Sequence, residues 1–221
     1  MSFIFGSKTK AQELLFLLQD VKEIVRQGFY ESELPAVETF CQEHNLYCIK
    51  SKFKVLFADE EKYSNKGFRI PETDSRPGMY FVYISKDEQK AWLAAYYELM
   101  NSDKELGLLL GYPSCCVDFF CRNFNKRDPG FNKNNASFNK NNTNFNKNGA
   151  GFNKNNTNLQ LPPKNLFTNL TKREQDLVLI SHFPCSSDCP KSIELAKKHL
   201  QVIYAVDKER ARELTTRLKV D

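Results

Sequence analysis

The chain is organised around residues 111–120, GYPSCCVDFF, and a second stretch far along the sequence, residues 181–189, SHFPCSSDC. Together the two stretches hold four of the seven cysteines and one of the three histidines. In each stretch a turn containing proline precedes a predicted amphipathic helix, so the thiols lie near the positive end of a helix dipole. That position favours thiolates. It therefore indicates chemistry at these cysteines rather than packing alone.

The first hypothesis is a metal site. Thiolates that bind zinc or an iron–sulfur cluster converge from at least two segments, because one short loop rarely presents four ligands. Adjacent residues at a helix start point about 100 degrees apart, so we expect one of the vicinal pair to bind and its neighbour to be spare. The predicted set is thus three thiolates and one imidazole. Its candidates are Cys115, Cys116, His182, Cys185 and Cys189.

The alternative hypothesis is a thiol-dependent enzyme or redox protein. A cysteine at a helix N-terminus with a nearby histidine can be an activated nucleophile, and paired cysteines can cycle through a disulfide. His182 would then be the base or proton shuttle, oriented by Asp118 or Asp188. A third interpretation treats the thiols as buried structural residues, since cysteine is among the most buried residue types.

The other three cysteines are predicted to lie outside this site. Cys41 falls on the apolar side of a predicted helix and Cys48 opens a predicted strand, so both are expected to be small buried hydrophobes. Cys121 follows the vicinal pair by five or six residues and points away from both on a helix.

A biased repeat separates the two motifs. Residues 124–158 are five heptads that begin with Phe-Asn-Lys and are rich in asparagine, with too little apolar surface to offset the entropy of ordering. We therefore expect a single compact domain formed by residues 1–123 and 159–221. The alternative role for the repeat is an interaction module that binds partners.

The net charge of +5 is fully explained by this repeat, which holds six basic residues and one acidic residue. The remaining chain is close to neutral, so it carries no specific nucleic-acid footprint. The first six residues are too short for a signal-peptide core, and no apolar run approaches bilayer length. We expect a cytoplasmic protein without a membrane span, in which the cysteines are reduced and a cluster of them indicates a metal or catalysis.

The periodicity predicts an α+β fold, mostly helical, with helices packed on one face of a small, mainly antiparallel sheet. Strands are expected at 49–57 and 79–84, the second more central, with a third near 68–70 inside a polar linker over 58–78. Helices are predicted over 9–28, from Pro35, after the capping boxes at 85–88 and 102–105, and from Thr171 through Ile180. Gly111 is predicted to end the helix that follows the capping box at 102–105, and Asp188 is predicted to be the N-cap residue of the last long helix.

The two motifs, Gly-Tyr-Pro-x-Cys-Cys-x-x-x-Phe and His-x-Pro-Cys-Ser-x-x-Cys-x-x-Ser, resemble those of an uncharacterised prokaryotic family, domain of unknown function 483. The likeness covers about residues 79–204 once the repeat is removed. It implies no established activity. It does imply that the candidate ligands named above share one site with Ser192. Substrate, reaction and partners stay open, since the chain has no glycine-rich phosphate loop or Gly-x-Ser-x-Gly elbow.

Overall fold

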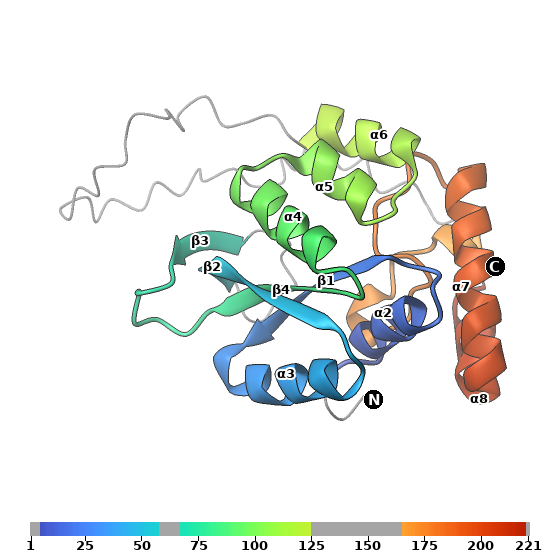
Figure 1. The fold of residues 1–221 in the computed structure, drawn as a ribbon. Coiled ribbons are helices and arrows are strands. Elements are labelled where there is room, and N and C mark those ends of the chain that lie inside the picture. The colour runs from blue at the N-terminus through green and yellow to red at the C-terminus, as the bar shows by residue number, and fades with distance from the viewer. Residues whose placement is uncertain (1–4, 58–66, 125–164, 220–221) are drawn as a thin grey trace.

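The fold is seen in a computed structural model, which describes residues 5–57, 67–124 and 165–219 (Figure 1). Its centre is a four-stranded antiparallel sheet with the strand order β1-β4-β2-β3. The strands are β1 (Ile24–Tyr30), β2 (Tyr47–Phe57), β3 (Gly67–Pro71) and β4 (Met79–Ser85). The predicted strands, including the third one, are thus present, but β4 is not more central than β2 as expected, because both are interior strands of the sheet.

Helices account for most of the remaining described chain, which confirms the α+β class. They are α2 (Lys8–Leu18), α3 (Leu34–Glu43), α4 (Glu88–Leu99), α5 (Asp103–Leu109), α6 (Ser114–Phe124), α7 (Pro190–Val206) and α8 (Lys208–Arg217). Short 3-10 turns cover Glu31–Glu33, Leu166–Thr168 and Arg173–Gln175. None of the helices in these described ranges is long and apolar enough to cross a membrane. The repeat over 124–158 falls almost wholly outside the described residues, as does part of the 58–78 linker.

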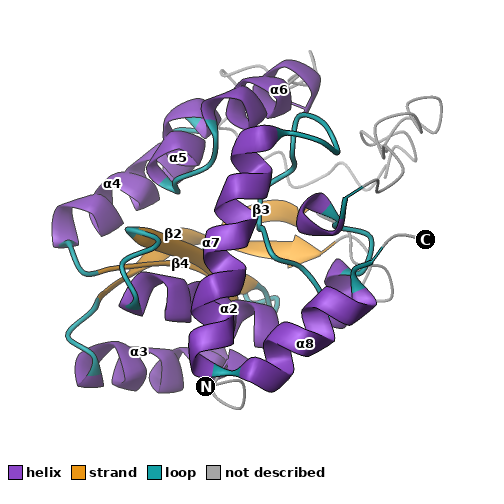
Figure 2. Ribbon diagram, turned by 90° about the vertical axis from the view of Figure 1, so that its right-hand side faces the viewer, coloured by secondary structure: helices purple, strands orange, loops and turns teal. Residues whose placement is uncertain are grey.

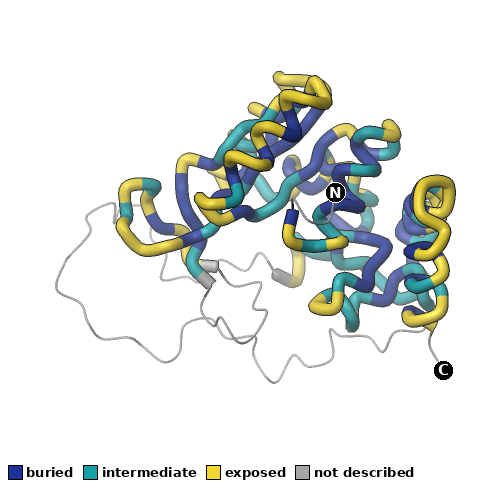
Figure 3. The backbone as a smooth tube through the Cα atoms, turned by 90° about the horizontal axis from the view of Figure 1, so that it is seen from below, coloured by how far each residue is buried: buried dark blue, intermediate teal, exposed yellow. Residues whose placement is uncertain are grey.

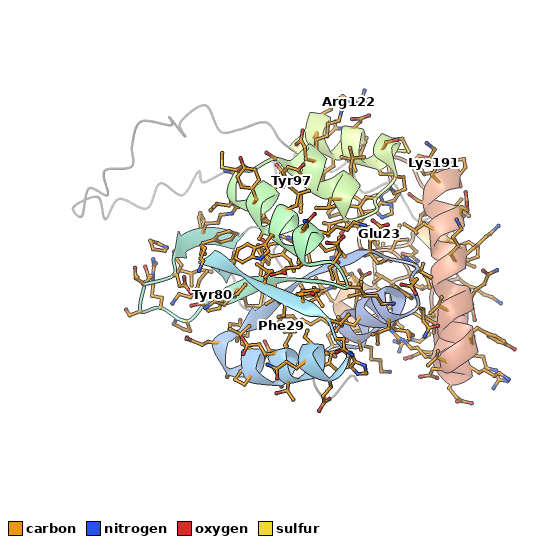
Figure 4. The ribbon with its side chains drawn as sticks, viewed as in Figure 1. Glu23, Phe29, Tyr80, Tyr97, Arg122 and Lys191 are labelled. Atoms are coloured by element: carbon orange, nitrogen blue, oxygen red, sulfur yellow. The ribbon has the colours of Figure 1, made fainter. Side chains whose placement is uncertain are left out.

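Helices cover both faces of the sheet, not one face as predicted (Figure 1). Alternate residues of a strand point to opposite faces, and β1 shows the consequence: Val25 and Phe29 pack in a core with α2 and α3, whereas Ile24 packs with α4 and α5. Figure 4 shows Phe29 on the α3 side of the sheet and Tyr97 among the helices on the other side. In Figure 3 the buried residues follow these inner surfaces.

A third core lies beside the sheet, where α7 and α8 pack against α2 and the chain after the last 3-10 turn (Figure 2). Leu177, Leu179 and Ile180 are buried there, together with Phe16 of α2 and Ile203 of α7. The N-terminal end of α7 lies beside α6 in both ribbon views (Figures 1 and 2). This arrangement brings the two cysteine motifs to one corner of the molecule.

The predicted helix over 9–28 is wrong in its second half. The helix ends at Leu18, Asp20 adopts a left-handed conformation with φ 57°, and β1 begins at Ile24. Apolar residues continue at helical spacing beyond the helix only because the sheet is covered on both sides. Ile24 and Val25 are therefore both buried, although they lie on opposite faces of the sheet.

The predicted helix from Thr171 to Ile180 is also wrong. Only residues 173–175 form a 3-10 turn, which ends at Asp176 with φ 59°, and the apolar residues that follow are an irregular buried segment. Buried carbonyls need donors, and side chains supply them: Gln12 donates to the carbonyl of Val178 (3.3 Å) and His199 to that of Leu179 (2.6 Å). Tertiary contacts therefore replace the helical hydrogen bonds.

Candidate metal centre

Four cysteines meet at the corner between α6 and α7. The sulfurs of Cys115, Cys116, Cys185 and Cys189, called here the four-sulfur centre, all lie within 4.8 Å of one another. The Cys115–Cys189 and Cys116–Cys189 sulfur distances are 3.7 and 3.6 Å. The predicted convergence of two distant motifs is confirmed. All seven cysteines are free thiols.

Two helix starts create this geometry. Gly111, with φ 77°, follows the end of α5, and the carbonyl of Pro113 accepts hydrogen bonds from the amides of Cys116 (2.8 Å) and Val117 (3.0 Å) as α6 begins. Facing it, Cys189 is the N-cap residue of α7, a position predicted for Asp188, and Pro190 is the first helical residue. Proline suits that position because its missing N–H has no helical partner to lose.

Both members of the vicinal pair reach the centre, contrary to the expectation that only one would. Their sulfurs are 3.9 Å apart. The 100 degree rule describes the directions of the Cβ atoms along a helix, whereas rotation about χ1 can bring two neighbouring sulfurs together. Cys116 is buried and Cys115 is half-buried, so the pair spans the inner and outer sides of the centre.

His182 lies next to the four-sulfur centre but is not one of its members. Its Nε2 is 2.8 Å from the Oγ of Ser192, and that oxygen is 3.2 Å from the sulfur of Cys116. The amide of Cys185 also donates to the Cys116 sulfur, at 3.3 Å. Ser192, which the family resemblance implied, therefore connects the histidine to the thiols.

Burial and hydrogen bonding give the thiols of the centre different pKa values. Burial raises the pKa of Cys116 well above its ordinary value and, with the neighbouring thiols, raises that of Cys185 to about 11. Burial would also raise the pKa of Cys189, but hydrogen bonds from the side chain and backbone of Ser192 lower it to about 7. Burial, helped by the charge of Lys22, lowers the pKa of His182 to about 3. The imidazole is therefore neutral.

The two aspartates proposed to orient His182 lie elsewhere. Asp118 forms an ion pair with Lys104 of α5 at 3.0 Å, and Asp188 is exposed beside Ser187. Cys121 stays outside the centre, as predicted. The predicted structural positions of Cys41 and Cys48 are also found, since both pack in the core between the sheet and α3.

Sequence reasoning missed a buried polar group behind His182. Lys22 and Glu13 form a buried ion pair, and Lys22 Nζ lies 5.6 Å from the centre of the Tyr112 ring. That ring in turn lies 5.1 Å from the imidazole of His182. Only Tyr112 had a sequence signal, as part of the first motif. The Glu13–Lys22 pair joins α2 to the loop before β1, and nothing in the pattern marked those residues as partners.

Apolar contacts also hold α6 in place. In its described portion the buried residues are Cys116 and Val117. Val117 packs against Gly107 of α5, where an added Cβ would lie 3.0 Å from a valine methyl carbon. Phe120 stacks with Phe183 at a ring-centre distance of 6.2 Å. The four-sulfur centre and the Phe120–Phe183 ring contact thus both join α6 to the chain leading into α7.

Comparison with known proteins adds no relatives: no protein-family model, curated protein or solved structure matches this chain. The resemblance to domain of unknown function 483 therefore stays a prediction from the two motifs. The geometry of the four-sulfur centre is the feature of the chain that points to a function.

Proposed function

We propose that the four-sulfur centre binds a single metal ion, zinc foremost, and that the metal fastens α6 to the chain around α7. The observation that carries this proposal is the approach of four sulfurs to within 4.8 Å of one another. They come from two elements that are 73 residues apart, counted from Cys116 to Cys189. Convergence of thiols over such a sequence separation is the signature of a metal site rather than of chance packing.

The sulfur distances favour one tetrahedral ion. With metal–sulfur bonds of about 2.3 Å, the edge of a regular tetrahedron is about 3.8 Å, and three of the six sulfur pairs measure 3.6, 3.7 and 3.9 Å, with all six within 4.8 Å. In a multi-iron cluster the thiolates bind different iron atoms, which requires wider spacing. Zinc, or a single iron ion in the same geometry, therefore fits better than the iron–sulfur cluster that the sequence left open.

Four thiolates complete a tetrahedron and leave no position for substrate, which is the arrangement of structural zinc sites. In the described portion of α6 one of the two fully buried residues is the ligand Cys116, so a metal bound there would add stability to the packing of this helix. His182 then acts on the centre through Ser192. The neutral imidazole donates its Nε2 proton to the serine oxygen, and the serine hydroxyl donates to the Cys116 thiolate. Such partners of ligands raise metal affinity.

Elemental analysis of protein purified without chelator tests the proposal, with about one zinc or iron per chain as the expected result. Cobalt added to metal-free protein is expected to give the intense charge-transfer and visible bands of a tetrahedral tetrathiolate. Replacing Cys189 with serine should abolish those bands, whereas Cys121→Ser, on α6 but outside the centre, should retain them. Metal-free protein that also takes up no cobalt would refute a metal centre.

One observation favours the alternative of a thiol enzyme: the pKa of Cys189, which burial tends to raise, is lowered to about 7 by its hydrogen bonds to Ser192. Its sulfur is poorly placed for substrate, however, because Cys189 is only 1% exposed. Two surface hollows, of about 450 and 500 Å³, lie on α4 and between α2 and α7, and neither is lined by a cysteine. We therefore assign no catalytic activity.

A reducing compartment is the setting that we propose, since the seven free thiols would otherwise be prone to oxidation. The cytoplasm meets that requirement. If the motif resemblance is correct, the same metal centre would be expected in the proteins of domain of unknown function 483.

A further inference from the structure

The four sulfurs of the centre fall into two pairs with different surroundings. Cys116 and Cys189, called here the inner pair, are each 1% exposed, whereas Cys115 and Cys185, the outer pair, are half-buried. The outer pair comes from different segments, so a reagent that approaches from solvent meets one thiol of each motif. Each motif therefore contributes one buried thiol and one thiol that solvent can reach.

Hydrogen bonding divides them in the same way. Ser192, which is fully buried, hydrogen-bonds through its hydroxyl to the sulfur of Cys116, at 3.2 Å, and through its backbone N–H to the sulfur of Cys189. The sulfur of Cys116 also accepts a hydrogen bond from the amide of Cys185. Within the described ranges, no N–H or O–H group donates to the sulfur of Cys115 or Cys185 apart from neighbouring thiols. Hydrogen bonds withdraw charge from a thiolate and make it less nucleophilic. The sulfurs of the outer pair are therefore the better nucleophiles.

Resting on the proposed metal centre, we propose that Cys115 and Cys185 are an oxidation site at which hydroperoxides form a disulfide and expel the metal. A bound metal holds all four sulfurs as thiolates, so access and hydrogen bonding decide which of them reacts. The two outer sulfurs already lie within 4.8 Å of each other. Closing a disulfide to about 2.05 Å requires only a local side-chain movement once the metal leaves.

The chemistry is a two-electron oxidation. One outer thiolate attacks the O–O bond of hydrogen peroxide, which gives a sulfenic acid and releases hydroxide. The other outer thiolate attacks that sulfur, forms the S–S bond and displaces the second hydroxide. Two protons from solvent convert the two hydroxides to water. The metal loses two of its four ligands and dissociates, while the inner pair stays reduced.

The test uses the full-length, metal-loaded protein and hydrogen peroxide in less than equimolar amount. A chromophoric chelator measures released metal, and samples are quenched early with N-ethylmaleimide in acid. Trypsin then yields peptides 105–122 and 174–191, which carry the two motifs. Mass spectrometry of the unreduced digest should find them joined, and fragment ions that separate Cys115 from Cys116, and Cys185 from Cys189, identify the bond.

We expect one metal ion released for each disulfide between Cys115 and Cys185, with Cys116 and Cys189 recovered as maleimide adducts. Dithiothreitol followed by zinc should restore the full metal content. The Cys121→Ser variant should behave identically, because that thiol is half-buried on the same helix but has no place in the centre.

A disulfide mainly involving Cys116 or Cys189 would overturn the inference while leaving the metal centre intact. So would metal release accompanied by irreversible sulfinic acid and no disulfide. Protein that binds no cobalt before oxidation would overturn the metal centre and, with it, this inference. The two failures are distinguishable because cobalt binding is measured first.

Discussion

Ser192→Ala tests the connection between His182 and the thiols most directly. The serine side chain is fully buried, and its single oxygen contacts both the His182 ring, at 2.8 Å, and the Cys116 sulfur, at 3.2 Å. Alanine removes one oxygen and leaves the imidazole with no partner at either ring nitrogen, since Nδ1 already has none in the described structure. The change creates almost no cavity, so lost hydrogen bonding dominates its effect.

The magnitude follows from two contributions. An unsatisfied buried donor costs about 1 to 3 kcal/mol, and loss of a group that supports a metal ligand lowers affinity by about 10- to 100-fold. Alanine is a better helix former than serine, by about 0.5 kcal/mol, which offsets a little of this loss. Tenfold in affinity is about 1.4 kcal/mol, so the three contributions sum to a fall of about 2 to 5 kcal/mol in the free energy of unfolding of the metal-loaded protein.

Urea denaturation gives the stability, and competition with a chelator gives the metal affinity. The cobalt form supplies a readout specific to the thiolate: its sulfur-to-metal charge-transfer band should move to lower energy, because the sulfur loses a hydrogen bond. Ser187→Ala is the matched control, since among the described residues that hydroxyl hydrogen-bonds to the exposed Asp188, at 3.3 Å, and not to a thiol. If Ser192→Ala left both the cobalt spectrum and the metal affinity unchanged, the proposed link would be refuted.

Three further predictions concern the scaffold. Glu98→Gln should destabilise the protein by about 2 to 3 kcal/mol in urea denaturation, because the Glu98 carboxylate, only 5% exposed, bridges Arg26 and Arg69 of the sheet, which are each about a third exposed. As a control, Glu194→Gln, at an exposed ion pair on α7, should change stability by less than about 0.5 kcal/mol. Gly107→Ala should lower the melting temperature, because the new methyl lies 3.0 Å from a methyl carbon of Val117 and such overpacking costs about 1 to 3 kcal/mol, more than the gain of up to about 1 kcal/mol in helix propensity. A higher melting temperature would mean that Val117 yields to the methyl and that α5 and α6 are not tightly packed there. Asp176→Asn should cost about 1 kcal/mol of stability at pH 7. Burial would raise the pKa of this carboxyl, but hydrogen bonds from the start of α2 lower it. The stability advantage of the wild type should therefore be full above about pH 4 and disappear as the pH falls through the lowered pKa, and a difference that does not depend on pH would contradict the assignment.

The sheet and the central helices could be predicted because their signals are local. Alternation in β2, the continuous apolar run of β4 and the residues before α4 and α5 each specify an element without reference to the rest of the chain. The errors fall where tertiary structure decides. Ile24 and Val25 read equally well as helix or as a strand buried on both faces, and the segment after Asp176 is held by side chains from α2 and α7 that no local pattern reveals.

The centre itself was predictable in composition but not in detail. Seven cysteines, four of them in two proline-containing segments that each lead into a helix, indicated convergence. The choice of ligands could not follow from spacing alone. Whether Cys115 and Cys116 both reach one point depends on their χ1 rotamers. The place of His182 depends on the hydroxyl of Ser192, which lies in the first turn of α7.

The distance between the motifs along the chain leads to a last prediction, the excision of residues 124–158. The ligands Cys116 and Cys189 are 73 residues apart, and removing the 35 residues of the repeat would leave 38. The entropy of closing a flexible segment varies as (3/2)RT times the logarithm of its length, so this halving is worth only about 0.6 kcal/mol. The metal affinity of the excised variant, measured with cobalt, should therefore lie within about threefold of the full chain. A much larger loss would mean that the repeat supports the centre directly, whereas unchanged affinity together with loss of a binding partner would assign the repeat an interaction role of its own.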